Sequence, residues 1–225
     1  LLSPIAANDA GYNNTLNAIV PNFNKPVPNV TITPQMWIRG INTYKARNLL
    51  VNKKVSELNA GDLTAIRTLA TAGMVEGDIT FLLGISAIAG EGLSPNNQQH
   101  IFLWNSHANN SGWIYPSERW VQDFKAGDQR FVKGVSVLPN PEVNRQARGI
   151  QFGSRYFFTA IQNGGYWSTN ARTGFANFAG SWEENALMLA EADIRGGQIE
   201  AGLARIDNVR NKQGAALAAV AGTGL

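Results

Sequence analysis

Residues 181–213, SWEENALMLAEADIRGGQIEAGLARIDNVRNKQ, predict two helices that turn back on each other. The first begins with a capping box, in which the side chains of Ser181 and Glu184 each satisfy a free backbone amide. Apolar residues follow at helical spacing until Gly196 and Gly197 end the helix. The second helix runs to Gly214, and four of its apolar residues share one face: Ile199, Leu203, Ile206 and Val209. Two helices joined by two glycines form an antiparallel hairpin, as in helical-repeat solenoids.

A helical segment is also predicted upstream. Thr33 is a good N-cap residue, and Pro34 suits the first position of a helix that continues to about Lys53. A second helix begins at Asn59, where Asp62 favours the helix N-terminus, and ends at Gly73.

Each of these helices has one apolar face and cannot bury it alone. We therefore expect the two helical segments to pack together, although more than 100 residues separate them. The residues expected to be buried are Ile38, Ile41, Leu49, Leu187, Ile199, Leu203 and Ile206. The predicted fold is mainly α, built from helix pairs.

Between the helical segments lies a long region with little periodicity. It is rich in aromatic residues, separated by Asn, Ser, Gly and Pro, and short apolar pieces such as 101–104 and 149–158 suggest a few strands. It is far longer than an ordinary loop, so it is functional or forms a subdomain. We expect one domain over 1–225, with a helical block at 33–78, an irregular region at 79–180 and a helical hairpin at 181–214.

Composition narrows the function. Charged residues make up 16% and the net charge is +3, without any long basic run, which argues against a nucleic-acid partner. The absence of cysteine excludes a disulfide scaffold and a cysteine zinc site. His100 and His107 are not spaced as metal ligands, and enzyme motifs are absent, so we expect no metal, no cofactor and no catalysis.

The irregular region carries the candidate ligand site. Four aromatic residues cluster with amides and hydroxyls between them: Trp104, Trp113, Tyr115 and Trp120. Sugar rings pack a C–H face on an aromatic plane and offer hydroxyls to polar groups at its rim, so Asn105 and Asn109 are expected as rim partners. Tyr166 and Trp167, after two glycines, form a second candidate tip. The same aromatics could instead fill a junction with the helices.

The charged residues of the irregular region have simpler interpretations. Its arginines are expected to hold loops in place by binding carbonyl groups, rather than to bind an acidic ligand: Arg145, Arg148, Arg155 and Arg172. A glycosidase needs two carboxylates that flank the sugar, and only Glu118 with Asp123 offers such a pair.

Three landmarks in order resemble the SusD/RagB family. They are the "W…N…KAR" helix with Trp37, Asn42 and 45–47, the "DxR" element at 128–130, and the helix pair EADIRGG…AGLARIDNVR at 191–210. The resemblance covers residues 34 to 214. It implies tetratricopeptide-like helix pairs that carry an irregular glycan-binding face, and it implies that Asp128 of the DxR element partners Arg130.

The resemblance also implies a cellular role. Such proteins are surface lipoproteins of the Gram-negative outer membrane that bind glycans and lie over a TonB-dependent transporter during polysaccharide utilization. The lipidated N-terminal cysteine of the family is absent from this chain, so the membrane would be reached only through an anchor outside it. We expect the chain to be an internal piece of a longer protein. The alternatives are a helical-repeat scaffold that binds protein and a glycoside hydrolase.

Overall fold

The computed structural model describes residues 4–19, 32–80, 82–86, 116–143, 153–158, 173–177 and 179–224. These residues are mainly α-helical, as predicted. The chain divides into two compact units. The helical unit comprises residues 1–83, 177–212 and 218–225, and the mixed unit comprises 84–176 and 213–217.

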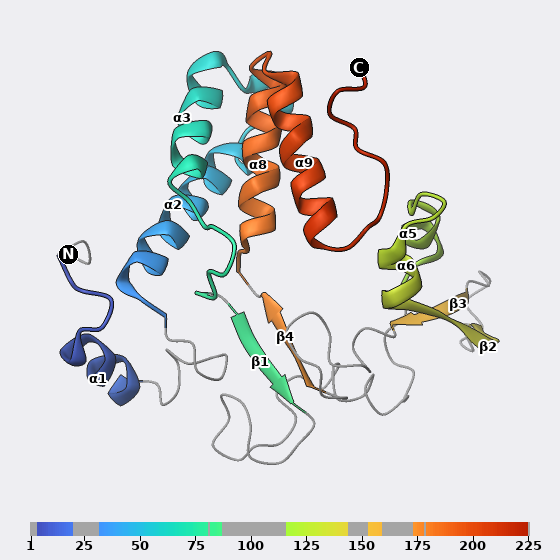
Figure 1. Cartoon of the computed structure of the whole chain (residues 1–225), viewed down its shortest axis with the longest axis horizontal. Coiled ribbons are helices and arrows are strands. Elements are labelled where there is room, and N and C mark those ends of the chain that lie inside the picture. The colour runs from blue at the N-terminus through green and yellow to red at the C-terminus, as the bar shows by residue number, and fades with distance from the viewer. Residues whose placement is uncertain are drawn as a thin grey trace. The chain divides into compact units, whose positions relative to one another are not determined.

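The helical unit contains five α-helices and a short 3-10 helix among its described residues (Figure 1). They are α1 (Ala10–Ile19), α2 (Pro34–Val51), η1 (Val55–Glu57), α3 (Ala60–Thr71), α8 (Trp182–Arg195) and α9 (Ile199–Lys212).

Side chains cap these helices largely where the sequence predicts it. Thr33 accepts a hydrogen bond from the amide of Met36, and Pro34 opens α2. Asn59 and Asp62 bond each other's backbone amides at the start of α3, at 3.0 and 3.1 Å. At α8 only half of the predicted capping box forms. Ser181 accepts from the amide of Glu184, but the Glu184 carboxylate lies 3.1 Å from Arg47. That ion pair joins α8 to α2.

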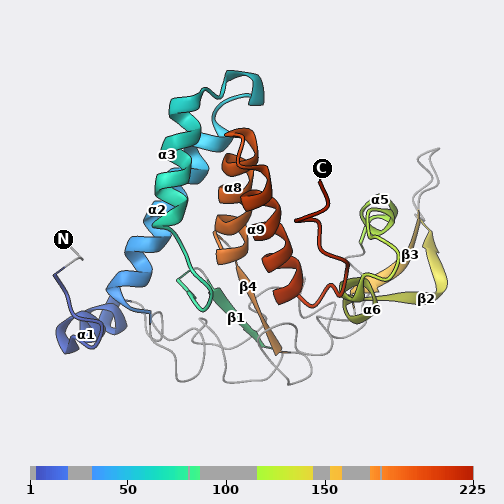
Figure 2. The ribbon, with the colours of Figure 1, turned by 45° about the horizontal axis from the view of Figure 1, so that its top comes forward.

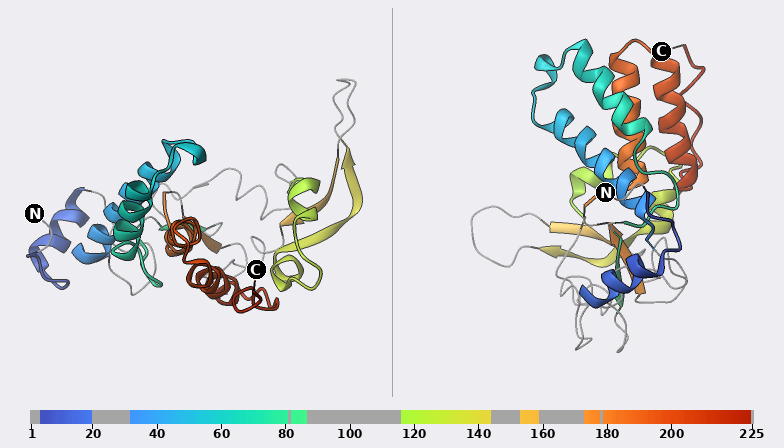
Figure 3. Two further views of the ribbon diagram at one scale, coloured as in Figure 1. Left: turned by 90° about the horizontal axis from the view of Figure 1, so that it is seen from above. Right: turned by 90° about the vertical axis from the view of Figure 1, so that its left-hand side faces the viewer.

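Helices α8 and α9 lie side by side and run in opposite directions, and they are seen nearly end-on in the left panel of Figure 3. Gly197 allows the turn because its φ of +83° is unfavourable for other residues. Gly202 allows the close approach, since a Cβ there would lie 2.5 Å from Ile194 Cγ1. The hairpin therefore depends on two glycines for different reasons.

The predicted packing of the two helical segments is confirmed. Helix α3 packs against both α2 and α8. The core between them consists of Ala46, Ile66, Ala70, Met188, Leu189 and Ala192. Met74, Trp182 and Val209 form a second cluster.

The predicted buried stripe is wrong at three positions. Ile41 and Leu187 are 45% exposed and Ile199 is 43% exposed. The other four, Ile38, Leu49, Leu203 and Ile206, are only partly buried. The reason is visible on α2, where the buried residues are the small ones Gly40, Thr43 and Ala46. Small side chains let helix backbones approach closely, and the larger apolar side chains then lie at the edges of the interface.

One buried amide connects three helices. Asn185 of α8 donates to the carbonyls of Ala70 and Met74, at 2.8 and 3.0 Å, where α3 ends. Its carbonyl accepts from the Thr43 hydroxyl of α2 at 2.9 Å, and that hydroxyl accepts from the Met74 amide. The last carbonyls of a helix have no partner within the helix, so Asn185 supplies one from the neighbouring segment.

Buried carboxylates are paired in the same unit. Asp193 of α8 lies 2.7 Å from Arg67 of α3 and 2.7 Å from Arg205 of α9, and its side chain is 1% exposed. Asp207 accepts from the amides of Val220 and Ala221 and so holds the C-terminal segment beside α9 (Figure 2). These amides, together with Arg210, lower the pKa of Asp207.

The mixed unit contains short helices and strands. Helix α5 (Glu118–Gln122) is followed by α6 (Gln129–Gly134), which continues directly into strand β2 (Val135–Val143). Strand β2 pairs antiparallel with β3 (Gly153–Phe158), with Val135 opposite Phe158 and Val143 opposite Gly153. The register shifts between Val137 and Glu142, because the segment between them contains two prolines, which lack an amide hydrogen.

The remaining two strands pair with each other. Strand β1 (Leu82–Ser86) pairs with β4 (Thr173–Asn177), and the boundary between the two units falls within these strands. Within the described part of the chain, no helix is long and apolar enough to cross a membrane.

The role of Asn185 yields a stability prediction. We expect Asn185→Ala to lower the free energy of unfolding by about 3 kcal/mol, because it removes three buried hydrogen bonds, to the Ala70 and Met74 carbonyls and from the Thr43 hydroxyl. Chemical denaturation followed by circular dichroism measures this. The matched control is Asn208→Ala on the exposed side of α9, which should change stability by less than about 0.5 kcal/mol. Equal stability of the two variants would contradict the assignment.

Candidate functional site

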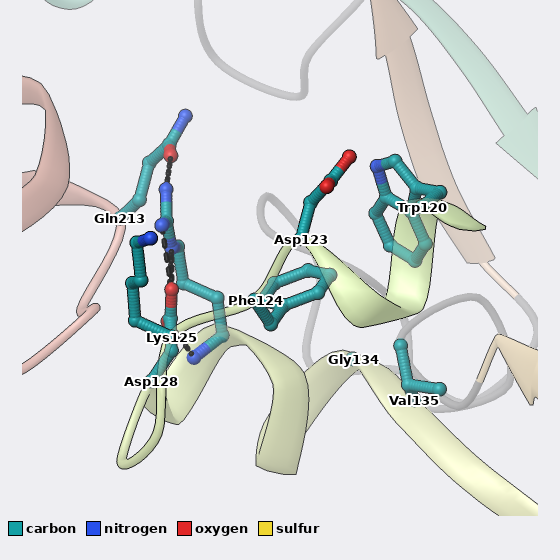
Figure 4. Close-up of a pocket in the computed structure, with 9 residues that line it drawn as sticks. Trp120, Asp123, Phe124, Lys125, Asp128, Gly134, Val135 and Gln213 are labelled. Carbon is teal, nitrogen blue, oxygen red and sulfur yellow. Dashed lines mark hydrogen bonds and ion pairs between the residues drawn. The ribbon is translucent and has the colours of Figure 1, made fainter. Parts of the chain in front are cut away.

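An open groove of about 470 Å³ lies within the mixed unit (Figure 4). Its lining residues come from α5, from the turn that follows it, from α6 and β2, and from the segment after α9. They are Trp120, Asp123, Phe124, Lys125, Asp128, Arg130, Gly134, Val135 and Gln213.

Trp120 is the exposed aromatic surface of this groove. Ser117 caps α5 by accepting from the Trp120 amide at 3.1 Å. The indole meets the ring of Phe124 edge-on, with centroids 4.8 Å apart and an angle of 89° between the rings. Even so, Trp120 remains 42% exposed. Aromatic side chains with a supported edge and an open surface are typical of ligand platforms.

Trp120 stands at one end of a row of aromatic rings, each in contact with the next. Phe124 lies 5.6 Å from Phe131 of α6, and Phe131 lies 5.9 Å from Tyr156 of β3. Contacts of this kind stabilise by about 0.5–1.5 kcal/mol each beyond the area they bury. The row fixes α5 relative to the β2–β3 ribbon, so the position of Trp120 depends on three separate elements.

An ion pair also joins α5 to β3. Arg155 of β3 donates to Glu118 of α5 at 2.7 Å, and the Arg155 backbone amide donates to the same carboxylate at 3.0 Å. The guanidinium also lies 5.4 Å from the centre of the Tyr156 ring. Hydrogen bonding by the Arg155 side chain is the main cause that lowers the pKa of Glu118. Glu118 therefore stays ionised.

The Asp128–Arg130 pair forms one wall of the groove, and its prediction from the sequence is confirmed. Asp128 caps α6, its side chain is 1% exposed, and Arg130 binds it at 2.6 Å. Arg130 also donates to the side-chain carbonyl of Gln213 at 3.1 Å, and the amide of Gln129 donates to the carbonyl of Ala215. Hydrogen bonding to Asp128 raises the pKa of Arg130. The motif thus attaches residues 213–217 to α6.

The other two charged side chains that line the groove are those of Asp123 and Lys125. Asp123 and Lys125 are exposed, and neither has an ion-pair partner among the described residues. In Figure 4 the Asp123 carboxylate points to the open side next to Trp120, whereas Lys125 lies on the side of Gln213. The groove therefore offers one acceptor and one donor of opposite charge.

Chemically this arrangement suits binding. Of its carboxylates, Asp128 is held by Arg130, and Glu118 outside the groove is held by Arg155. A glycosidase acid must carry a proton, and its pKa is raised for that purpose. Glu118 has the opposite shift, which counts against the Glu118–Asp123 pair. Among the described residues there is no cluster of three or more acids or histidines that could hold a metal.

The structure describes only part of the predicted site. The seven candidate ligand residues all lie outside the described residues: Trp104, Asn105, Asn109, Trp113, Tyr115, Tyr166 and Trp167. Trp120, the fourth aromatic of the predicted cluster, lies in the groove. Arg155 does hold the fold, but through a carboxylate and not through the expected carbonyl. Arg145, Arg148 and Arg172 lie outside the described residues.

Sequence reasoning missed Phe124, Lys125 and Gln213. Phe124 follows Trp120 by four residues, a spacing at which helical side chains meet, and this signal was available. Gln213 reaches the groove from the far end of the chain, and nothing in its local sequence indicates that.

Comparison with known proteins adds no relative. No family model, no curated protein and no solved structure matches the chain. The functional argument therefore depends on the residues themselves.

The Glu118–Arg155 pair predicts a measurable titration. In a carbon-detected NMR titration, Glu118 should titrate below the ordinary glutamate value of 4.5. Arg155→Met should return its pKa toward that value, and Arg119→Met, the neighbouring arginine of α5, should move it less. The stabilising contribution of the pair is complete above the ordinary pKa and is lost as the pH falls through the lowered one. A Glu118 pKa above 4.5 in the parent protein would restore it as a candidate acid.

Proposed function

We propose that this protein captures glycans at the cell surface and passes them to a TonB-dependent outer-membrane transporter, as a SusD/RagB-type protein. The observation that carries the proposal is Trp120, which is 42% exposed in a groove whose rim presents the Asp123 carboxylate and the Lys125 ammonium group, neither of them in an ion pair with another described residue. The landmark residues in the sequence give the proposal its cellular setting.

The physical argument starts from the chemistry of sugars. A pyranose ring has an apolar C–H face that packs on an indole, and hydroxyls around its edge that need donors and acceptors. Trp120 supplies the flat surface, and Asp123, Lys125 and the Gln213 amide supply the polar partners. One aromatic contact and a few hydrogen bonds, less the cost of association, give an affinity between about millimolar and micromolar. Such weak binding suits a protein that must release its cargo.

Several landmark residues of the resemblance have structural roles, which supports using them as family markers. Asp193, Arg205 and Gly202 hold α8 to α9, and Asp128 with Arg130 holds the segment after α9. On this proposal the helix pairs are tetratricopeptide-like and face the transporter, while the irregular region, with its aromatics outside the described residues, faces the glycan. The protein would lie on the outer membrane through a lipid anchor outside this chain, without a nucleic-acid partner.

The proposal predicts that binding depends on exposed aromatics. We expect Trp120→Ala to weaken binding of oligosaccharides at least about tenfold in isothermal titration calorimetry, because it removes the stacking surface. Trp104→Ala, Trp113→Ala and Tyr115→Ala test the remaining cluster in the same assay, and Tyr166→Ala and Trp167→Ala test the second tip.

The control is Val132→Ala, an exposed apolar residue of α6 that does not line the groove. It should bind like the parent, and circular dichroism checks that every variant is folded. If no oligosaccharide of a broad panel binds the parent protein, glycan capture is wrong, and binding to proteins becomes the better explanation for the helix pairs.

The proposal also predicts the absence of hydrolysis. Polysaccharides incubated with the protein should release no reducing ends above a blank, because hydrogen bonding by Arg155 lowers the pKa of Glu118, whereas a glycosidase acid has a raised pKa. Turnover that disappears in Glu118→Gln or Asp123→Asn would replace the binding protein with a glycosidase.

A further inference from the structure

We propose that the Trp120 groove selects an uncharged sugar unit, with the Asp123 carboxylate accepting hydrogen bonds from two neighbouring hydroxyls while Lys125 donates to another. This inference deepens the proposed function and rests on it. It concerns which class of glycan the groove accepts, and it follows from which charges of the groove are already compensated.

Two of the four charged groups that line the groove neutralise each other. Arg130 binds Asp128 through its Nε and Nη2 atoms, at 3.0 and 2.6 Å to the nearest oxygens, and its Nη1 donates to Gln213. The Asp128 side chain is 1% exposed, so its charge faces Arg130 and not the ligand. A negatively charged ligand therefore gains little from Arg130, whose charge is compensated by Asp128 and whose Nε, Nη1 and Nη2 each already donate a hydrogen bond.

The two remaining charges are opposite and accessible. Asp123 follows α5 directly and Lys125 comes two residues later, and neither forms an ion pair within the described part of the chain. Their sum is zero. A ligand carboxylate would be attracted by Lys125 and repelled by Asp123. Asp123 lies next to Trp120 and Lys125 on the side of Gln213, so the carboxylate of a sugar stacked on Trp120 meets the repelling group (Figure 4).

Hydrogen-bond chemistry then favours a neutral sugar. A carboxylate only accepts and an ammonium group only donates, whereas a hydroxyl does both. Neighbouring hydroxyls can donate to the two oxygens of Asp123, and a third can accept from Lys125. A uronate carboxylate cannot donate to Asp123. A uronate on Trp120 could still donate its ring hydroxyls to Asp123, but its own carboxylate would then lie close to the Asp123 carboxylate and be repelled by it.

The test compares neutral and acidic oligosaccharides on matched variants. The probes are hexamers of glucose, mannose and xylose, and hexamers of galacturonate and mannuronate, measured by calorimetry at constant ionic strength. We expect the parent protein to bind its best neutral hexamer at least about tenfold more tightly than either uronate. Asp123→Asn should weaken neutral binding and bring the two classes within about threefold, because repulsion of the uronate is removed.

Two further variants complete the design. Lys125→Met should weaken both classes, with the larger loss for uronates. Lys133→Met removes an exposed lysine of α6 that does not line the groove and should leave both affinities unchanged. Trp120→Ala, which should abolish most binding of the neutral hexamer, verifies that the measured site is this groove.

The outcomes separate the two levels of the proposal. If glycans bind and Trp120→Ala removes the binding, but uronates bind as tightly as neutral hexamers or Asp123→Asn leaves the ratio unchanged, the charge selection is wrong and glycan capture stands. If glycans bind independently of Trp120, this groove is not the site and the inference is overturned. If none of the probes binds, glycan capture itself fails.

Discussion

The amide of Asn185 is the constraint on which the helical unit depends. A buried polar group without a partner costs about 1–3 kcal/mol. Asn185 of α8 donates to the carbonyls of Ala70, near the end of α3, and of Met74, just after it, and Thr43 of α2 accepts from the Met74 amide. Because both partners come from other segments, the end of α3 determines where α2 and α8 must lie. The apolar core then fills the space that these hydrogen bonds define.

The buried carboxylates likewise need partners inside the protein. Asp78, Asp193 and Asp128 are almost fully buried, and each is bound by at least one arginine. Removing one partner of such a pair is strongly destabilising because it leaves an uncompensated charge in a poorly solvated site. Two of these pairs, Arg39–Asp78 and Arg67–Asp193, connect segments that are distant in sequence. They also have a functional consequence, since Asp128 and Arg130 are withdrawn from the groove.

The groups that the groove can offer to a ligand are those that the Asp128–Arg130 pair does not include, namely Trp120, Asp123 and Lys125. The aromatic row from Tyr156 through Phe131 and Phe124 holds Trp120 with its surface open. A platform that is already fixed loses little conformational entropy on binding, and this matters when the total affinity is small. Asp123 and Lys125, which form no ion pair within the part of the chain that the structure describes, would add directional hydrogen bonds without a net charge. The combination of a rigid apolar surface with a neutral polar rim is the physical basis of the proposed glycan binding.

The sequence by itself determined the local structure of this protein. The N-caps at Thr33, Asn59 and Ser181 and the break at Gly196 and Gly197 are local signals, so helices α2, α3, α8 and α9 could be predicted, as could the Asp128–Arg130 pair within its motif, whereas α1, α5 and α6 were not predicted. Only the tertiary structure decided which faces are buried. Ile41 and Leu187 were expected in the core, but Gly40, Thr43 and Ala46 form the contact, because backbone approach favours small side chains over large ones. It also decided that Glu184 turns to Arg47, that Arg155 binds Glu118 and that Gln213 lines the groove. Each of these contacts joins residues far apart in sequence, and local periodicity and spacing cannot predict contacts of this kind.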